Sequence, residues 1–464
     1  MTGAIHAIDQ YLRDTQSAAV GTLCELLRIP SISTDPQQRQ QVARCAEAVA
    51  KLLASVGAKV QTWQTDGCPA VFGRVDVDPR LPTVLLYGHY DVQPAGELAR
   101  WSSPPFEPRI SESGRIYARG AADNKGQFFL QVRAVEAWMR TSGRPPVNVK
   151  LLIEGEEEIG SPNLRTLLSD RRNDLSGDLV VMSDTPLWRP GRPALSLGTR
   201  GITGLEVVVT GPNRDLHSGM YGGSFPNPIA ILSRMLARLH DEQGRIAVPG
   251  FYDDVKPIPP DLHDEWECLA LEIGGEQALF GCGFSGESGF NVLERRWLRP
   301  TLEFNGITGG YQGPGSSTII PSRASAKITC RLVPDQDPEV IQAALKRQLE
   351  SLAPAGAKLE FILRRSGAPA YSIRADHPAM ESAGRVLAEV YGTPPVRVRE
   401  GLSLPILPMF RDVLGADTLL LGFCDPACNA HSFDEFIDSA DLLRGAQAAA
   451  RFLGALHGVL EIRR

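Results

Sequence analysis

The sequence is poor in the features that mark several protein classes. Eight cysteines in 464 residues are too few for a disulfide framework, so reduced thiols are expected. Lysine and arginine together number 48 against 54 for aspartate and glutamate, which argues against a general nucleic-acid binder. No window approaches the roughly 18 uncharged apolar residues that a membrane span needs. A soluble globular protein remains, with 43% hydrophobic and 22% charged residues.

The N-terminal segment also lacks a targeting signal. It reads MTGAIHAIDQYLRD, with acidic side chains and no unbroken apolar run, whereas secretory signals and anchors need such a run. We therefore expect a cytoplasmic location, with neither a membrane nor nucleic acid as partner.

Hydrophobic periodicity predicts an α/β protein of two or three domains. A helix opens the chain and stops at Pro30. Helices and buried strands then alternate, which favours a three-layer α/β domain with a mostly parallel sheet. The expected strands are 83–87, 147–153, 179–182 and 418–421, and the expected helices are 39–56, 125–140, 378–390 and 440–456.

The middle of the chain has a different pattern of predicted strands and helices. Strand-like runs such as GLEVVVTG and ASAKITCRLV flank helices between residues 203 and 372. The simplest architecture is a catalytic domain of residues 1–202 and 373–464, interrupted by an inserted α+β domain of residues 203–372.

Acidic and histidine residues follow the predicted strands of the α/β part. In open α/β sheets, ligands bind outside the carboxyl ends of the strands, so these side chains could converge on one crevice. A Gly-flanked turn before a helix, ARGAADNKGQ, adds Asp123. The residues after the strands are His89, Asp91, Glu156, Glu157, Glu158, Asp184 and His431.

Each of these residues has an ordinary structural explanation when taken alone. Asp123 could be a helix N-cap and Asp184 a turn residue. Cys424, Cys428 and His431 follow the order C-x3-C-x2-H, but a structural zinc knuckle would need a fourth ligand. The ordinary explanations weaken together, because buried charges at sheet ends are costly unless they are paired or bind metal.

Two imidazoles with several carboxylates suit a pair of divalent metals, Zn²⁺ or Mn²⁺ with Co²⁺ as a further option, rather than Ca²⁺ or Mg²⁺. Two such ions need a bridging carboxylate, and together they would polarise a carbonyl and supply hydroxide at neutral pH. A carboxylate outside the metal shell is then required as general base. The neighbours Glu157 and Glu158 could divide these duties.

The ordered segments GHYDVQP, ARGAADNKG, EGEEEIGS, VMSDTP, DLHSGMYGG, CRLVP, REGLSLP and NAHSFDE resemble the co-catalytic dizinc peptidases of the aminoacylase, carboxypeptidase G and desuccinylase type. The similarity is greatest to the cytosolic nonspecific dipeptidase and carnosinase branch. It implies that His89 and Asp184 bind one metal, that Glu158 and His431 bind the other, and that Asp123 bridges them. It also implies a cis peptide bond between Asp123 and Asn124.

The same resemblance assigns roles around the metals. Glu157 becomes the general base, and Asp91 hydrogen-bonds the far ring nitrogen of His89. His217, from the inserted lid and dimerisation domain, would act in the partner subunit's active site and stabilise the oxyanion, which implies a homodimer.

Substrate-binding residues follow from the resemblance as well. Arg331 would grip the substrate carboxylate, which suits a guanidinium fork. Gly401 and Ser403 match a turn that holds the same end, although Leu402 replaces the usual small residue, and Thr318 is a weaker candidate.

The leading hypothesis is a metal-dependent dipeptidase that hydrolyses the amide bond of dipeptides with a free C-terminal carboxylate. An N-acyl amino acid deacylase with the same metals is the alternative, because fold and metal site do not separate the two. A metal-binding protein without turnover is disfavoured, since Glu157 and every expected ligand are present.

Overall fold

The chain forms two compact units. The computed structural model describes residues 2–363 and 367–460. Unit 1 comprises Met1–Leu197, Ile373–Val398 and Ile406–Arg464, and unit 2 comprises Gly198–Ser372 and Arg399–Pro405. The short segment Arg399–Pro405 therefore belongs with unit 2, whereas the sequence pattern places it in the first domain.

Unit 1 is built on a mixed β-sheet with strand order β1-β2-β6-β3-β7-β17-β8. Its four central strands, β6, β3, β7 and β17, are parallel, and the outer pairs are antiparallel. The α/β class is confirmed, with parallel pairing confined to the centre of the sheet. The strands are β1 (Lys59–Trp63), β2 (Ala70–Val75), β3 (Thr83–His89), β6 (Asn148–Glu154), β7 (Leu179–Met182), β8 (Ala194–Thr199), β16 (Val396–Glu400) and β17 (Thr418–Leu420).

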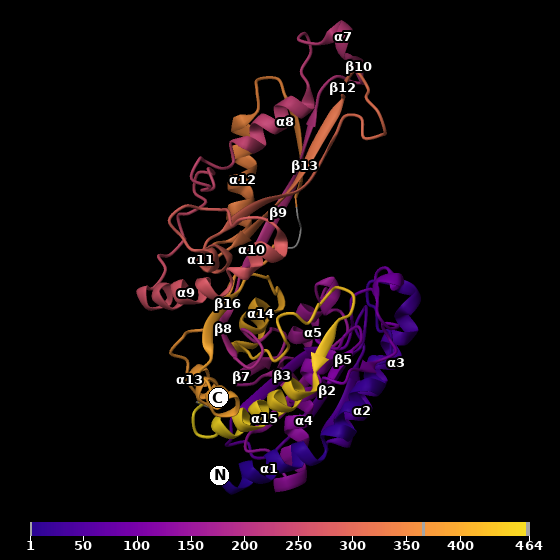
Figure 1. Ribbon diagram of the computed structural model, residues 1–464, viewed down its shortest axis with the longest axis vertical. Coiled ribbons are helices and arrows are strands. Elements are labelled where there is room, and N and C mark those ends of the chain that lie inside the picture. The colour runs from indigo at the N-terminus through magenta and orange to yellow at the C-terminus, as the bar shows by residue number, and fades with distance from the viewer. Residues whose placement is uncertain (1, 364–366, 461–464) are drawn as a thin grey trace. The chain divides into compact units, whose positions relative to one another are not determined.

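The central strands read as apolar runs because both of their faces are covered. Six of the seven residues of β3 are buried, and all four of β7 are buried. Helix α4 packs on β3 and against α15, as Figure 1 also shows, and α3 packs on β1 and β2. The helices of unit 1 are α1 (Thr2–Asp14), α2 (Gln16–Leu27), α3 (Arg39–Ser55), α4 (Lys125–Ser142), α5 (Leu164–Asp170), α6 (Arg172–Leu175), α13 (Pro378–Tyr391), α14 (Ile406–Met409) and α15 (Ser439–Ala455).

Most predicted elements of unit 1 agree with the structure to within a few residues. The opening helix is an exception, because it divides at Thr15 into α1 and α2. Short elements that the sequence pattern does not reveal complete the unit. They are the 3-10 turns η1 (Pro36–Gln38), η2 (Leu98–Arg100) and η3 (Glu157–Ile159), the π-helical turn η4 (Phe410–Leu414), and the small sheet of β4 (Arg109–Ile110), β5 (Arg115–Tyr117) and β18 (Phe436–Asp438).

Unit 2 is an α+β unit around a four-stranded antiparallel sheet with order β11-β13-β9-β14. Its core lies between this sheet and the helices α8 and α12, with Val207, Met235 and Leu345 fully buried. The strands are β9 (Gly201–Thr210), β10 (Leu216–His217), β11 (Thr301–Gly309), β12 (Ile319–Ile320), β13 (Arg323–Leu332), β14 (Lys358–Leu363) and β15 (Tyr371–Ser372). The helices are α7 (Ser218–Tyr221), α8 (Pro228–Ala237), α9 (Pro260–Glu272), α10 (Gly275–Phe280), α11 (Val292–Trp297) and α12 (Pro338–Leu352).

A small two-stranded extension lies at one end of unit 2. Strands β10 and β12 pair there, with Leu216 opposite Ile320 and His217 opposite Ile319, and α7 follows directly. Figure 1 shows α7, β10 and β12 together beyond the end of the longer sheet.

Within residues 2–363 and 367–460, no helix is both long enough and apolar enough to cross a lipid bilayer.

Candidate metal centre

The parallel strands of unit 1 bring four of the predicted side chains to one edge of the sheet. Strand β3 ends at His89, β6 leads into Glu158, β7 leads into Asp184, and the loop after β17 carries His431. Because β6, β3, β7 and β17 are neighbours and point the same way, their carboxyl ends meet at that edge. The side chains predicted to converge therefore lie together at this edge.

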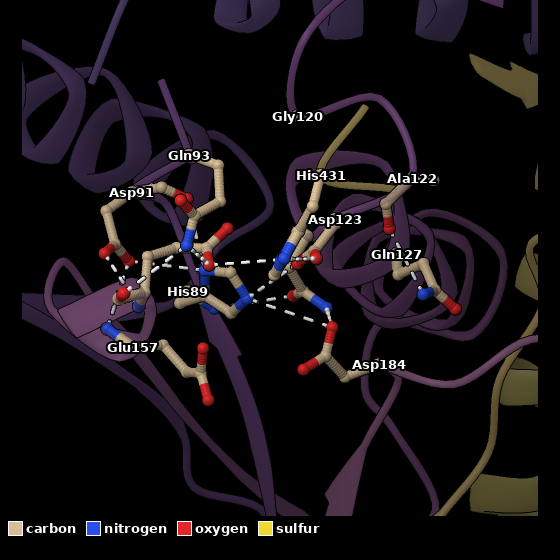
Figure 2. Close-up of polar contacts among 12 residues, drawn as sticks. His89, Asp91, Gln93, Gly120, Ala122, Asp123, Gln127, Glu157, Asp184 and His431 are labelled. Carbon is tan, nitrogen blue, oxygen red and sulfur yellow. Dashed lines mark hydrogen bonds and ion pairs between the residues drawn. The ribbon is translucent and has the colours of Figure 1, made fainter. Parts of the chain in front are cut away.

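Asp123 lies between the two histidines. Its Oδ1 is 3.2 Å from His89 Nε2, and its Oδ2 is 2.9 Å from His431 Nε2. Figure 2 shows Asp123 between the two rings, with Asp184 beside His89. The two oxygens of one carboxylate thus face two imidazoles, which is the arrangement expected of a bridging ligand.

Two further carboxylates complete the cluster. Asp184 Oδ1 lies 3.8 Å from His89 Nε2, and Glu158 Oε2 lies 3.3 Å from His431 Nε2. Ligand atoms of His89, Asp123 and Glu158 all lie within 4.8 Å of one another. The buried atoms His89 Nε2 and Glu158 Oε1 make no hydrogen bond with the described residues. Imidazole and carboxylate ligand atoms that lie close together, some of them buried without a hydrogen-bond partner, fit divalent metal ions.

His89 is fixed in the orientation that metal binding needs. Its Nδ1 lies 3.1 Å from the backbone carbonyl of Asp91 and 3.3 Å from the Asp91 carboxylate. A carbonyl oxygen only accepts, so Nδ1 carries the hydrogen, and in the neutral ring the Nε2 lone pair faces Asp123. The Asp91 carboxylate also accepts the backbone N–H groups of Glu157 and Glu158, at 3.2 and 3.1 Å.

The pKa shifts in the cluster reflect an excess of negative charge from its carboxylates. Hydrogen bonds that the protonated His431 ring donates to the carboxylates of Asp123 and Glu158 raise the pKa of His431 to about 10. Burial opposes protonation of His89, but the surrounding aspartates outweigh it and hold the pKa of His89 well above its ordinary value. Burial, reinforced by Asp123, raises the pKa of Asp184 to about 6. The carboxylates thus attract positive charge, which divalent cations supply.

Glu157 stands apart from these contacts. Burial raises the pKa of Glu157 well above its ordinary value, and the charges of Asp184, Glu158 and Asp123 add to the effect while His89 opposes it. Figure 2 shows its carboxylate beside the cluster. A carboxyl group with a raised pKa can accept and hold a proton near neutral pH.

Residues around the cluster orient its members, and the prediction did not include them. Gln93 Nε2 donates to Glu158 Oε2 at 2.7 Å, and Asn124 Nδ2 donates to Asp184 Oδ1 at 2.6 Å. The Asp123–Asn124 peptide bond is cis, as the resemblance implies. Gln93 and Asn124 lie within the quoted segments GHYDVQP and ARGAADNKG, but their partners are distant in sequence and no local pattern predicts these contacts.

Glu435 is the most connected of these supporting residues. It is fully buried, and its carboxylate accepts the backbone N–H groups of Gly120, Ala122 and Asp123 at 2.9, 2.9 and 3.0 Å. Arg119 Nη1 donates to it at 2.7 Å. The turn that presents Asp123 is therefore folded around one buried carboxylate.

The contacts bear on two alternatives that the sequence left open. The ring of His431 faces Asp123 and Glu158, which agrees with the sequence argument against a zinc knuckle of Cys424, Cys428 and His431. Glu156 is structural, because its carboxylate accepts from the Cys68 backbone and the Asn163 side chain.

The residues predicted to bind substrate form two groups within unit 2. Arg331 Nη1 donates to Ser403 Oγ at 2.8 Å, and Arg200 Nε donates to the Gly401 carbonyl at 2.9 Å. The second group surrounds the exposed His217, where the Ser218 backbone N–H donates to the Thr318 carbonyl at 2.9 Å.

The sequence pattern described as Peptidase family M20/M25/M40 matches residues 85–455. The chain belongs to this family. Its relatives include the Cys-Gly metallodipeptidase dug1 of Schizosaccharomyces pombe, which is 31% identical over 95% of this chain and 96% of the relative. The Beta-Ala-His dipeptidase of Rattus norvegicus is 31% identical over 98% of this chain and 97% of that protein.

Solved structures of M20/M25/M40 peptidases share the fold. An M20 family metallo-carboxypeptidase, Sso-CP2 from Sulfolobus solfataricus, superposes with a TM-score of 0.82 at 31% identity, over 94% of this chain and 99% of that chain. The family resemblance drawn from the motifs is therefore confirmed, and the chain is a hydrolase of a metallopeptidase family.

The Glu435 network makes a prediction about stability. Replacing Glu435 with Gln leaves Arg119 buried without its counter-charge, so the free energy of unfolding should fall by about 3 to 5 kcal/mol. Glu389→Gln is the control, because Glu389 is 60% exposed and 3.4 Å from Arg451, and its loss should cost under about 1 kcal/mol. Urea denaturation of the metal-free protein measures both, and equal losses would contradict the assigned role.

Proposed function

We propose that the protein is a metal-dependent dipeptidase that hydrolyses the amide bond of dipeptides with a free C-terminal carboxylate. The observation that carries this proposal is the position of Asp123, with one carboxylate oxygen toward each of two histidines. The raised pKa of the neighbouring Glu157 and the family membership support it.

In this proposal, His89 and Asp184 would hold one metal ion, Glu158 and His431 would hold the second, and Asp123 would serve both. Nitrogen and carboxylate ligands suit Zn²⁺ or Mn²⁺, with Co²⁺ as a further option. When bound, the two ions supply Lewis acidity toward the scissile carbonyl and make water a better nucleophile. Asp91 keeps His89 in its metal-binding tautomer.

Glu157 moves the proton in this mechanism. Its carboxylate takes the proton of the attacking water and later gives it to the departing amine, so that one residue acts as base and then as acid. Burial and the adjacent carboxylates raise its pKa, and the bound cations would offset part of that effect. The outcome is a group that exchanges its proton readily near neutral pH.

Arg331 is proposed to hold the free carboxylate of the substrate. The hydrogen bond from Arg331 to Ser403 Oγ, and that from Ser403 Oγ to the Gly201 carbonyl at 3.0 Å, fix this end of the site. The Gly401 carbonyl anchors Arg200 beside them. A fixed guanidinium recognises a carboxylate through two parallel hydrogen bonds.

His217 and Thr318 are proposed to act from a second subunit. In β13, Arg323 is next to the β10–β12 extension and Arg331 lies eight residues further on, a separation of about 27 Å along an extended strand. A dipeptide spans at most about 7 Å. One copy of unit 2 therefore cannot place both His217 and Arg331 on the same dipeptide.

The surface around His217 suits a second copy of the chain. Met220, Tyr221 and Phe225 lie close to it in sequence and are 71%, 38% and 49% exposed. Exposed apolar side chains that gather in this way mark association surfaces. We assign the active form as a homodimer in which unit 2 serves as lid and dimerisation domain, and we expect it in the cytoplasm.

A pair of substrates tests the proposed activity against N-acyl amino acid deacylation. The protein reconstituted with Mn²⁺ or Zn²⁺ should hydrolyse Ala-Leu with a larger kcat/KM than N-acetyl-leucine, because a dipeptidase recognises the free ammonium group. Release of leucine is measured for both. A clear preference for the N-acetylated substrate would overturn the dipeptidase assignment in favour of a deacylase.

Glu157→Gln tests the general base. The amide cannot take a proton from water, so kcat should fall by a factor of about 10² to 10⁴. Metal content, measured by elemental analysis, should be unchanged because Glu157 is not among the ligands. Full activity in this variant would contradict the role of Glu157.

Mixed dimers test the action of His217 in the partner subunit. A His217→Ala chain and a Glu157→Gln chain are each expected to be inactive as homodimers. If the two residues serve one site from different chains, a heterodimer purified through two affinity tags contains one intact site. Its activity should approach half that of the wild-type dimer. Verified heterodimers without activity would show that His217 does not act across the subunit boundary.

A further inference from the structure

Unit 2 contains an arginine-rich cavity of about 580 Å³. Its walls come from Arg200 just before β9, the segment after α8, the loop before α11, α11 itself, the start of β11 and the end of β13. Two carboxylates, Glu287 and Glu303, face five guanidinium groups in this lining. The arginines are Arg200, Arg295, Arg296, Arg299 and Arg331.

Two of these arginines are neutralised within the protein. Arg299 donates through Nε and Nη2 to the two carboxylate oxygens of Glu287, at 2.8 and 2.7 Å, in a buried bidentate pair. Arg296 makes a comparable pair with Glu276. The positive charges of Arg299 and Arg296 are therefore compensated by Glu287 and Glu276 within the protein.

Arg200 is held in place by one hydrogen bond, but another of its buried nitrogen atoms lacks an acceptor. Its Nε donates to the Gly401 carbonyl at 2.9 Å, which fixes the plane of the guanidinium. Its Nη1 is buried and has no hydrogen-bond acceptor within residues 2–363 and 367–460. Buried donors are nearly always paired in native proteins, so an orphaned one indicates a missing acceptor.

The charge around Arg200 points to an anion as that acceptor. Burial, together with the positive charges of Arg331 and Arg296, lowers the pKa of Arg200 to about 10, and Glu303 only partly compensates. Arg331 lines the same cavity as Arg200. A carboxylate between them would supply the missing acceptor and relieve their mutual repulsion.

We propose that this cavity binds the side-chain carboxylate of an acidic C-terminal residue, with Arg200 as its main hydrogen-bond donor. The inference rests on the proposed function, in which Arg331 holds the α-carboxylate of the same residue. Dipeptides that end in glutamate or aspartate are then the favoured substrates, and Arg200 is a specificity-determining residue.

The isosteric pair Ala-Glu and Ala-Gln tests the inference, because only the side-chain charge differs. A charge-assisted hydrogen bond should give wild-type protein a kcat/KM for Ala-Glu at least about tenfold above that for Ala-Gln. Arg200→Met should bring that ratio close to one. Arg347→Met is the matched control, since Arg347 is exposed on α12 and outside the cavity, and it should leave the ratio unchanged.

Two outcomes would overturn the inference. One is a ratio near one in the wild-type protein. The other is an equal loss for Ala-Glu and Ala-Gln in Arg200→Met, which would show that Arg200 holds the α-carboxylate or only supports the fold.

A second variant tests the proposed carboxylate site if Arg200→Met does not fold. Glu303→Gln removes the carboxylate that partly compensates Arg200, on the exposed part of β11. The preference for Ala-Glu should rise in this variant. An unchanged or smaller preference would overturn the inference.

A binding measurement separates this inference from the proposed function. If the wild-type protein hydrolyses neither dipeptide, the dipeptidase proposal has failed. Calorimetry with free L-glutamate and L-glutamine then reports on the cavity alone. Binding of glutamate that exceeds that of glutamine and is lost in Arg200→Met supports the carboxylate site. Equal binding of the two amino acids overturns it.

Discussion

The position of Asp123 between two histidines is the constraint on which the candidate metal centre of unit 1 depends. Its two oxygens face His89 and His431 at 3.2 and 2.9 Å, so one carboxylate defines two adjacent positions for positive charge. Asp184, Glu157 and Glu158 lie around the same point, and their mutual repulsion is unfavourable in a buried setting. The folded chain is therefore arranged for cations that it does not itself provide.

Support for this arrangement comes from residues that do not face the cluster centre. Glu435 accepts three backbone N–H groups of the turn before α4, including that of Asp123. Asp91 similarly accepts the backbone N–H groups of Glu157 and Glu158 while it orients His89. Buried carboxylates that hold backbone turns explain how a cluster of like charges keeps a fixed geometry.

The sequence allows part of this site to be predicted from physical reasoning alone. Strands β3 and β7 are buried on both faces and read as apolar runs, so the polar residues that follow them, His89 and Asp184, stand out. Asp123, in a turn, and His431, in a long loop, are candidates on the same pattern, and only the resemblance to a family predicts which metal-binding role each would have. Neither approach predicts a role for Arg200 or for Glu435, although Glu435 lies in the quoted segment NAHSFDE, because their partners Gly401 and Arg119 are 201 and 316 positions away in sequence.

The two units place their functional candidates differently because their sheets are built differently. Parallel strands gather side chains at one edge, and this concentrates the reactive groups of unit 1. The long antiparallel strand β13 instead separates its ends, with Arg331 near one and the His217 extension beyond the other. A unit built in this way can take part in one site with one end and in a neighbouring copy's site with the other.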